Sequence, residues 1–341
     1  MGEKVRSGQE RSEPEPDAII RLEDEGWRAQ ILISSVELDV FTAIDRGLRT
    51  AGRLATAKGW DELATGNLLN SLCPLGLLKK RKGVYSLTPM PRAFLSRESS
   101  TYGGDAFLMN VSPRFIGNLG RYVRTGRASI PNVSSAALMQ AWREEALMES
   151  RRRTRIPQSL KMWRLAGLDP KKRRHLRILD IASGCGIKSL TMARYNPDAE
   201  VTCLDSPKVV EVAKRLAKEW RVDDRAMFIG GNLMKHEFGS GEYDAVLLGQ
   251  INFFLDEREN TALMKRVCRA LKPGGIVMIH APVVDEERCR SPALPWSLWV
   301  SLFSDGGGAF TFSEISRILR RAGFGGVRGH GDMLVTARKK K

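Results

Sequence analysis

The second half of the chain alternates between short apolar runs and amphipathic stretches. The apolar runs predict strands that are buried on both faces, as in a mainly parallel sheet. The stretches between them place apolar residues at helical spacing, as Val209, Ala213 and Leu216 do within 206–222. Strands and helices repeated in this order predict an α/β domain with a mostly parallel, doubly wound sheet.

The elements expected in this half have the following boundaries. The predicted strands are 177–182, 200–205, 227–231, 243–249, 276–284, 325–328 and 333–338. The predicted helices are 188–195, 206–222, 256–271 and 311–322. Ser206 is the expected N-cap of the second helix, and Thr311 with Glu314 predicts a capping box at the start of the last helix.

The first half of the chain predicts helices and one small hairpin. The predicted helices are 19–28, 30–44, 50–58 and 62–72. A charged segment with Gly83 near its centre predicts a hairpin over 79–87. With the two helices before it, this hairpin predicts a winged-helix arrangement. Helical spacing with bulky apolar residues continues over 109–148.

A winged helix can bind DNA or serve as a dimerisation module. The basic wing at 79–82 favours DNA binding. The candidate recognition helix 62–72, however, contains no lysine or arginine, and the apolar stretch 109–148 is an appendage that DNA binding does not need. We therefore predict a homodimer formed by the N-terminal half and expect no nucleic-acid partner.

The length of 341 residues predicts about two domains. Residues 1–17 are polar and contain no apolar signal segment, so we expect a disordered leader. The helical winged-helix and dimerisation domain is expected over 18–155, and the α/β domain over 156–341. No apolar run approaches the roughly 20 residues that a transmembrane helix needs, so we expect no transmembrane segment.

Charge and cysteine content narrow the class of protein further. Lysine and arginine total 55 against 39 aspartate and glutamate, which gives a net charge of +16. The basic runs lie at expected turns and termini, where a role in solubility explains them more simply than a nucleic-acid or membrane surface. The 5 cysteines form no CxxC pair. We therefore expect no metal site and no disulfide scaffold, and we expect a reducing cytoplasm.

The strongest site motif is Asp180-Ile-Ala-Ser-Gly184-Cys-Gly186, which follows the first strand of the α/β half and opens a helix. Ligands of open α/β sheets bind at the carboxyl ends of the strands. The two glycines permit a tight turn and let a ligand lie against the backbone. The second strand ends in Asp205, and an acidic side chain there can accept both hydrogen bonds of a ribose diol.

Two classes of cofactor use this arrangement. A nicotinamide or flavin dinucleotide requires a third glycine, and Ser189 stands at that position. S-adenosylmethionine carries no phosphate and needs a loop that accepts an amino-acid moiety and a ribose. The pattern D-x-x-x-G-x-G followed by Asp205 therefore predicts S-adenosylmethionine.

Several segments of both halves carry a family resemblance. They are Glu37–Phe41, Leu75–Leu78, Tyr85–Thr88, Asp180–Gly186, Asp205–Val210, Leu271–Gly275 and Ala322–Phe324. With these segments the chain resembles the small-molecule O-methyltransferases, class I enzymes with an N-terminal winged-helix dimerisation domain. The family includes bacterial antibiotic and carotenoid methyltransferases, plant phenolic methyltransferases and the C-20 methyltransferase of bacteriochlorophyll synthesis. The resemblance implies a Rossmann-like catalytic sheet, a small-molecule methyl acceptor and a homodimer.

The resemblance also implies which residues bind the cofactor. The glycine loop would line its methionine part, and Asp205 would hold the ribose. The family has a Gly-Asp-hydrophobic triplet beside the adenine, and here Asn232 replaces the acid and can accept from the adenine amino group through its carbonyl oxygen. The implied cofactor-binding residues are Asp180, Ala182, Ser183, Gly184, Gly186, Asp205, Ser206, Asn232, Leu233, Gly249 and Gln250.

One departure from the family concerns the catalytic base. Family members that deprotonate a phenol carry a histidine after the fourth strand, and Phe253 stands at that position. The usual partner acid after the fifth strand is absent too, since that stretch reads His280-Ala281-Pro282. His280 is the remaining candidate for catalysis, although a hydrogen-bonded histidine beneath a loop is an equal alternative. Without a base, the acceptor must already be nucleophilic.

An aromatic cluster predicts the character of the substrate. Trp296, Trp299 and Phe303 share one helical face by their spacing. The resemblance implies that they roof a substrate pocket beside the helix that contains Met162 and Trp163, and plain core packing is the alternative. A pocket with these walls favours a hydrophobic or aromatic acceptor.

We therefore predict an S-adenosylmethionine-dependent methyltransferase that acts on oxygen or carbon of a hydrophobic or aromatic small molecule. The alternative is a family member that binds the same cofactor and catalyses a non-methylating reaction.

Overall fold

The protein is described by a computed structural model, in which residues 16–112, 119–128, 136–172 and 174–340 are described. The chain divides into two compact units that meet in sequence between Ser99 and Ser100. The predicted domain boundary at 155–156 lies within the second unit and stays a prediction. The segment that begins at Ser100 belongs to the second unit because the helices that it forms pack against other elements of that unit. Most of the expected leader lies outside the described residues, and a helix already begins at Asp17.

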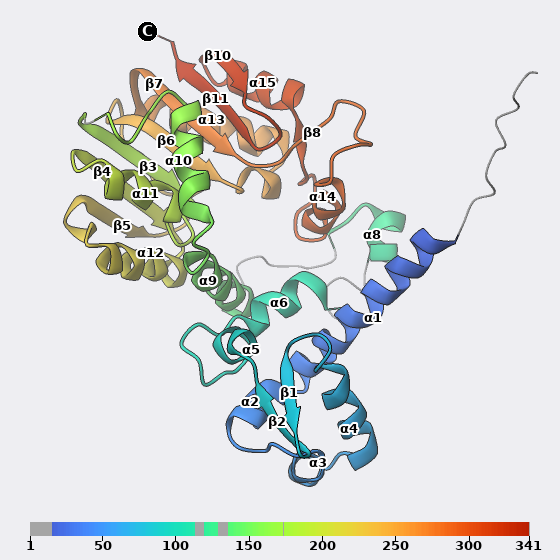
Figure 1. Ribbon diagram of the computed structural model, residues 1–341. Helices are drawn as coiled ribbons and strands as arrows, with labels where there is room; N and C mark the ends of the chain where they lie inside the picture. Colours follow the sequence, from blue (N-terminus) through green and yellow to red (C-terminus); the bar gives the residue numbers. More distant parts are fainter. Residues whose placement is uncertain (1–15, 113–118, 129–135, 173, 341) are drawn as a thin grey trace, which may run out of the picture. The chain divides into compact units, whose positions relative to one another are not determined.

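The first unit consists of one long helix, several short helices and a two-stranded hairpin (Figure 1). Its elements are α1 (Asp17–Glu37), α2 (Val40–Asp45), α3 (Ala51–Lys58), α4 (Glu62–Ser71), β1 (Leu78–Arg81), β2 (Val84–Leu87) and α5 (Pro89–Phe94). The hairpin is antiparallel and turns at Lys82 and Gly83, both with positive φ. The predicted order of helix, helix and hairpin is therefore confirmed.

The predicted break between the first two helices was misplaced. The sequence predicted helices over 19–28 and 30–44, whereas α1 runs without interruption through this region to Glu37. The break follows at Asp39, whose backbone is left-handed with φ of 56°. A single left-handed residue ends the helical hydrogen-bond pattern, and α2 begins directly after it.

The second unit contains the larger sheet and most of the helices. Its helices are α6 (Gly104–Val111), α8 (Leu119–Thr125), α9 (Ala136–Ser150), α10 (Arg155–Leu165), α11 (Ile187–Tyr195), α12 (Pro207–Trp220), α13 (Glu257–Ala270), α14 (Leu294–Ser301) and α15 (Phe312–Arg321), with short 3₁₀ turns η1 (Asp223–Arg225) and η2 (Asn252–Phe254). Its strands are β3 (Leu176–Ile181), β4 (Ala199–Asp205), β5 (Ala226–Gly230), β6 (Tyr243–Gly249), β7 (Leu271–His280), β8 (Val283–Val284), β9 (Phe310–Thr311), β10 (Phe324–Gly329) and β11 (Leu334–Lys339).

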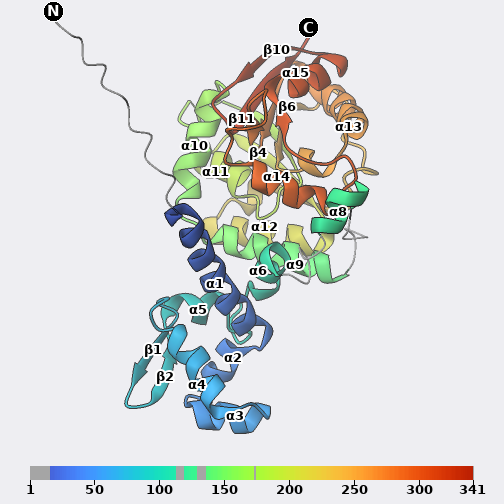
Figure 2. The ribbon, with the colours of Figure 1, turned by 90° about the vertical axis from the view of Figure 1, so that its right-hand side faces the viewer.

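The main sheet has seven strands in the order β10-β11-β7-β6-β3-β4-β5. The strands from β7 to β5 are parallel, and β10 and β11 are antiparallel at one edge. Helices cover both faces of the sheet (Figures 1 and 2). The predicted fold class, a mostly parallel doubly wound sheet beside an N-terminal helical winged-helix unit, is confirmed.

Alternation along the strands divides the interior into two cores. Ile178 of β3 belongs to the core beneath α10, α11 and α12, and its neighbour Leu179 belongs to the core beneath α13 and α15. The alternation arises because successive side chains of a strand point to opposite faces. Helix α9 joins the first core, where it packs against α12, and it also packs against α6.

The predicted strand 276–284 was wrong at both ends. Strand β7 already begins at Leu271 and ends at His280. Pro282 follows, and because proline has no backbone N–H it cannot continue the ladder. Val283 and Val284 form the separate strand β8, which pairs with β9.

The two helix caps that the sequence predicted are found at the predicted residues. The predicted capping box between Thr311 and Glu314 is present on α15, and Asp256 with Glu259 forms a second one on α13. Ser206 occupies the N-cap position of α12 as predicted, but its side chain makes no capping hydrogen bond.

Among the described residues, no helix is both long and apolar enough to span a membrane.

Candidate active site

Two strand ends define the site, where the order of the strands reverses. The chain runs outward from β3 through β4 to β5, and β6 then returns to the other side of β3. Ligands of doubly wound sheets bind at the carboxyl ends of the strands beside such a switch point. Ala182 follows β3 and Gln250 follows β6, with left-handed φ values of 56° and 62°. Non-glycine residues are uncommon in this conformation, and such backbone strain clusters at functional sites.

The glycine loop after β3 leaves an open backbone surface. At Gly184, where φ is 57°, a Cβ would meet no atom within 4 Å. At Gly186, where φ is 69°, a Cβ would lie 3.0 Å from the Leu190 side chain and 3.2 Å from that of Ala213. Gly184 therefore leaves room for a ligand, and Gly186 allows α11 and α12 to pack closely at the loop.

Asp180 anchors the loop to the helix that follows it. Its buried carboxylate accepts a hydrogen bond from Ser189 Oγ at 2.5 Å. Burial raises the pKa of this carboxyl to about 6, and the Ser189 hydrogen bond opposes that rise. Asp180 thus holds β3 against α11, and Ser189 has a structural role at the position where a dinucleotide-binding protein would carry its third glycine.

Asp205 organises the opposite side of the loop. Its two carboxylate oxygens accept from the backbone N–H groups of Gly184 at 2.8 Å and of Ser206 at 2.7 Å. Burial raises the pKa of Asp205 above its usual range, and these two N–H groups limit the rise. Each oxygen retains a lone pair, so the carboxylate can still accept the hydrogen bonds of a diol.

Unpartnered buried polar atoms mark the site. Ser183 Oγ, Ser206 Oγ, His280 Nδ1 and Trp299 Nε1 are buried without a hydrogen-bond partner in the described part of the chain. These four atoms belong to residues that the sequence assigned to the cofactor, the substrate or catalysis, whereas Asn252 Oδ1 and Ser316 Oγ, which also have no partner in the described residues, do not. Because buried polar groups in folded proteins nearly always have partners, these atoms indicate a polar ligand.

The predicted adenine side is less regular than the family pattern suggested. Asn232 Oδ1 accepts from the Met234 N–H at 2.8 Å, so the carbonyl oxygen proposed for adenine is already engaged within its own turn. The Asn232 side chain is exposed, and Leu233 packs against the core beneath α13 and α15. Leu233 is therefore placed to offer an apolar contact, and a contact of Asn232 with adenine stays a prediction.

The far side of the predicted cofactor site lies at the end of β6. Gly249 is partly exposed, and the position of a Cβ on it would lie 3.2 Å from Lys188 Nζ. Gln250 is exposed, and its N–H donates to the His280 carbonyl at 3.2 Å. The end of β6 thus meets the end of β7 next to the glycine loop.

Aromatic side chains gather beside the end of β6. Phe253 is buried and packs edge-on against Trp296, with ring centroids 4.5 Å apart. Trp299 stacks on Trp296 at 6.2 Å and contacts Phe303 at 4.5 Å. The structure therefore brings together Phe253 and the three aromatic residues that the sequence placed around a substrate.

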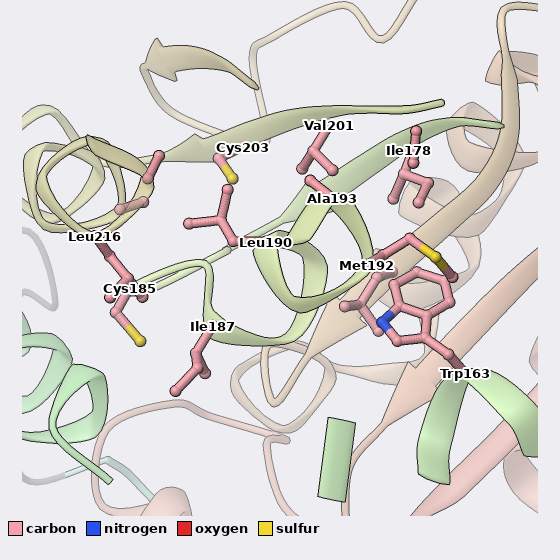
Figure 3. Close-up of a cluster of buried hydrophobic side chains, with 14 of the residues drawn as sticks. Trp163, Ile178, Cys185, Ile187, Leu190, Met192, Ala193, Val201, Cys203 and Leu216 are labelled. Atoms are coloured by element: carbon pink, nitrogen blue, oxygen red, sulfur yellow. The ribbon is translucent and has the colours of Figure 1, made fainter. Parts of the chain in front are cut away.

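Met162 and Trp163 do not lie with these aromatic residues. Both are buried in the core beneath α10 and α11, whereas Phe253 belongs to the core on the other face of the sheet. Trp163 donates from Nε1 to the Lys188 carbonyl at 2.8 Å, and Figure 3 shows its indole beside Met192. A direct substrate contact of Met162 or Trp163 stays a prediction that these positions do not support.

His280 ends β7, opposite Gly249 in the sheet register. Burial lowers the pKa of its imidazole to about 3, and the positive charge of Lys188 lowers it further. The ring is therefore neutral at neutral pH, and Nδ1 can form a hydrogen bond that the chain itself does not supply.

The sequence reasoning missed three side chains at the site. Trp142 of α9 packs edge-on against Phe254, with centroids 5.6 Å apart, and Phe254 lies 6.5 Å from Phe303. Lys188 of α11 reaches the end of β6. Phe254 is adjacent to Phe253, and Lys188 lies two residues beyond the glycine motif. The sequence therefore contains a local signal for both residues.

Comparisons with known proteins agree with this geometry. The family described as the O-methyltransferase domain matches residues 148–325, and the O-methyltransferase dimerisation domain matches residues 22–97. The chain belongs to the O-methyltransferase family. S-adenosylmethionine is therefore the cofactor of this enzyme, and the predicted family, reaction class and cofactor are confirmed.

The matches to individual relatives cover most of this chain. The tetracenomycin polyketide synthesis 8-O-methyl transferase TcmO of Streptomyces glaucescens is 27% identical over 92% of this chain and 92% of its own. The 3-hydroxy-5-methyl-1-naphthoate 3-O-methyltransferase of Streptomyces sahachiroi is 26% identical over 89% of this chain and 87% of its own. The crystal structure of human N-acetylserotonin methyltransferase shares the fold, with a TM-score of 0.70, 22% identity and coverage of 97% and 99%.

The residues of this O-methyltransferase fit its cofactor. The Asp205 carboxylate has lone pairs for ribose hydroxyls, and Ser206 Oγ and Ser183 Oγ have no hydrogen-bond partner in the described residues. The open backbone at Gly184 admits the amino-acid part. Bound at this site, S-adenosylmethionine supplies an electrophilic methyl group.

Proposed function

We propose that this enzyme methylates an oxygen or an electron-rich carbon of an aromatic small molecule that binds against the aromatic cluster. The observation that carries this proposal is the placement of Phe253, Trp296 and Trp299 beside the end of β6. The partly exposed rings of Trp296 and Trp299, backed by the buried Phe253, favour an aromatic ligand, and the unpartnered Trp299 Nε1 offers it one hydrogen bond. The names of the polyketide and naphthoate methyltransferases among the relatives support the same class of acceptor.

Phe253 sets the catalytic strategy that we propose. Its phenyl ring is buried at the position where the family resemblance implies a catalytic histidine, and it has no atom that can accept a proton. His280 is neutral, but an imidazole with a pKa of about 3 is a weak proton acceptor. The chain would then act by orienting the acceptor and excluding water, with the acceptor oxygen ionised before it reacts or a carbon as the nucleophile.

Methyl transfer to defined probes tests the proposed function. The enzyme would be incubated with S-adenosylmethionine and a panel of naphthols and hydroxynaphthoates, and the products analysed by mass spectrometry. We expect a product heavier by one CH₂ and an equal amount of S-adenosylhomocysteine. A probe that is consumed without any methylated product would establish the non-methylating alternative.

His280→Ala separates catalysis by positioning from catalysis by a base. We expect kcat/KM to fall by less than about tenfold, because a neutral ring of low pKa contributes a hydrogen bond and not proton transfer; a general base is typically worth about 10²- to 10⁴-fold. We also expect no inflection that depends on His280 between pH 5 and 9, since its pKa of about 3 lies below that window. A loss of 100-fold or more with unchanged cofactor affinity would identify His280 as the base.

We infer that the enzyme is a homodimer formed through its N-terminal half. Helix α1 exposes Ile19, Leu22 and Trp27, with 72%, 67% and 64% of their surface accessible. Exposed apolar side chains of this size along one helix are typical of an interface. The match of residues 22–97 to the dimerisation domain supports the same conclusion.

The free state of all 5 cysteines supports a reducing cytoplasm as the enzyme's location.

Trp27→Asp is expected to weaken the dimer by at least about tenfold, because an aromatic anchor at an interface typically contributes more than about 1.4 kcal/mol. Light scattering across a dilution series measures the change. Met227→Asp on β5 is the matched control, since Met227 is also exposed at 62% but lies outside α1. A wild-type chain that is monomeric at micromolar concentration would contradict the proposed dimer.

A further inference from the structure

The Lys188 ammonium lies at the centre of the site and has no assigned role. Lys188 is the second residue of α11, directly after the glycine loop. Its Nζ lies 3.2 Å from the position that a Cβ would occupy on Gly249. A side chain at 249 would therefore crowd the ammonium group, which would have to shift slightly, so Gly249 lets Lys188 lie close to the end of β6.

Within the part of the chain that the structure describes, no acceptor satisfies this ammonium. In the described residues, Lys188 Nζ makes no hydrogen bond and no ion pair. The nearby acids form their hydrogen bonds and ion pairs elsewhere: Asp180 accepts from Ser189, and Glu149 pairs with Arg155. The charge of Lys188 acts on Asp180 only through space, where it opposes the rise of the Asp180 pKa. Lys188 and Arg155 both lower the pKa of His280, so cationic groups predominate at this point.

The position in the helix adds to the positive potential. The N-terminus of an α-helix carries a partial positive charge, so a lysine in its first turn is disfavoured and an anion is favoured. The first turns of α13 and α15 follow this rule with acidic residues. In α11 the lysine and the helix end instead reinforce each other beside the unpartnered Nδ1 of His280. An anion at this point would offset the charges of the lysine and the helix end, and it can accept a hydrogen bond from Nδ1 in the tautomer that carries the proton there.

We propose that Lys188 is the anion-binding residue of the site and receives a carboxylate or another anionic oxygen of a bound molecule. This inference rests on the proposed function, which supplies two sources of such an oxygen. One is the carboxylate of the cofactor's methionine part, and the other is a carboxylate or ionised hydroxyl of the methyl acceptor. In either case Lys188 binds and orients the molecule.

Two pairs of probes distinguish these sources. S-adenosylhomocysteine carries the amino-acid carboxylate, whereas 5′-methylthioadenosine lacks it, and calorimetry gives both affinities. 3-Hydroxy-2-naphthoate and 2-naphthol differ in one carboxylate, and their binding to the protein saturated with S-adenosylhomocysteine can be followed by tryptophan fluorescence. Each measurement is made on the wild type and on Lys188→Met, which retains the length of the side chain without its charge.

We expect Lys188→Met to reduce the preference for the carboxylated member of one pair by about 10- to 100-fold, the range of a hydrogen bond to a charged group. A loss confined to the adenosine pair assigns Lys188 to the cofactor, and a loss confined to the naphthalene pair assigns it to the acceptor. Lys188→Arg should restore most of the preference, because it retains the charge. Thermal unfolding of each variant confirms that it folds.

Lys208→Met is the matched control. Lys208 is likewise the second residue of its helix, α12, but it is exposed to solvent. We expect this variant to keep both preferences within about twofold. If Lys188→Met also keeps both preferences, or if the wild type shows neither, the anion-binding role is overturned. The methylation assay on the naphthol panel is independent of these affinities, so a failure of the proposed function would be recognised separately.

Discussion

Asp205→Ala is expected to weaken the binding of S-adenosylhomocysteine by about 10²- to 10⁴-fold. A hydrogen bond to a charged group is worth about 1.5–3 kcal/mol, and the carboxylate can accept two from a ribose. The substitution also leaves the N–H groups of Gly184 and Ser206 without the acceptors that they have in the structure. The loop would therefore lose both its ligand contact and its internal support.

Isothermal titration calorimetry measures this loss directly. Asp223→Ala is the control, because Asp223 lies exposed in η1 and makes no contact with the glycine loop. Asp205→Asn refines the result, since an amide retains one acceptor oxygen and should recover part of the affinity. Unchanged affinity in Asp205→Ala would remove Asp205 from the cofactor site.

The part of the site that the sequence predicted depends on local signals. The glycine motif, the strand before it and the acid at the end of the next strand lie within 26 residues, from Asp180 to Asp205. Gly184 and Gly186 have the positive φ values that the motif requires, and Asp205 lies within hydrogen-bond distance of the Gly184 N–H. Short segments of this kind fix their own geometry, so the pattern was sufficient.

Other features depend on contacts between distant segments. Lys188 acquires its significance only because β6 ends beside α11, and the packing of Trp142 on Phe254 joins α9 to the loop after β6. The engagement of Asn232 within its own turn is a choice between two acceptable hydrogen bonds, which residue type alone does not decide. Periodicity and motif spacing could not predict these contacts, because they depend on which distant segments the fold brings together.

At Trp163, the role implied by the family resemblance differs from the position of the side chain in the structure. The family resemblance placed it at the substrate, whereas its side chain is fully buried at 0% exposure and donates to the Lys188 carbonyl. Sequence resemblance identifies a position along the chain, but the face of a helix on which a residue packs depends on its neighbours. Here those neighbours are the buried side chains of the core beneath α10 and α11, some of which Figure 3 shows.

Trp163→Ala is accordingly expected to lower the free energy of unfolding by about 3–5 kcal/mol, the range for removing a large aromatic side chain from a core. Urea denaturation followed by circular dichroism measures the change. Trp163→Phe should lose less, because the ring still fills most of the space and only the hydrogen bond to the Lys188 carbonyl is removed. If Trp163→Ala instead unfolds at the wild-type urea concentration while 2-naphthol binds more weakly, Trp163 lines the acceptor site. An effect on stability with little change in the affinity for 2-naphthol would place Trp163 in the core that supports α11, and through α11 the loop that holds the cofactor.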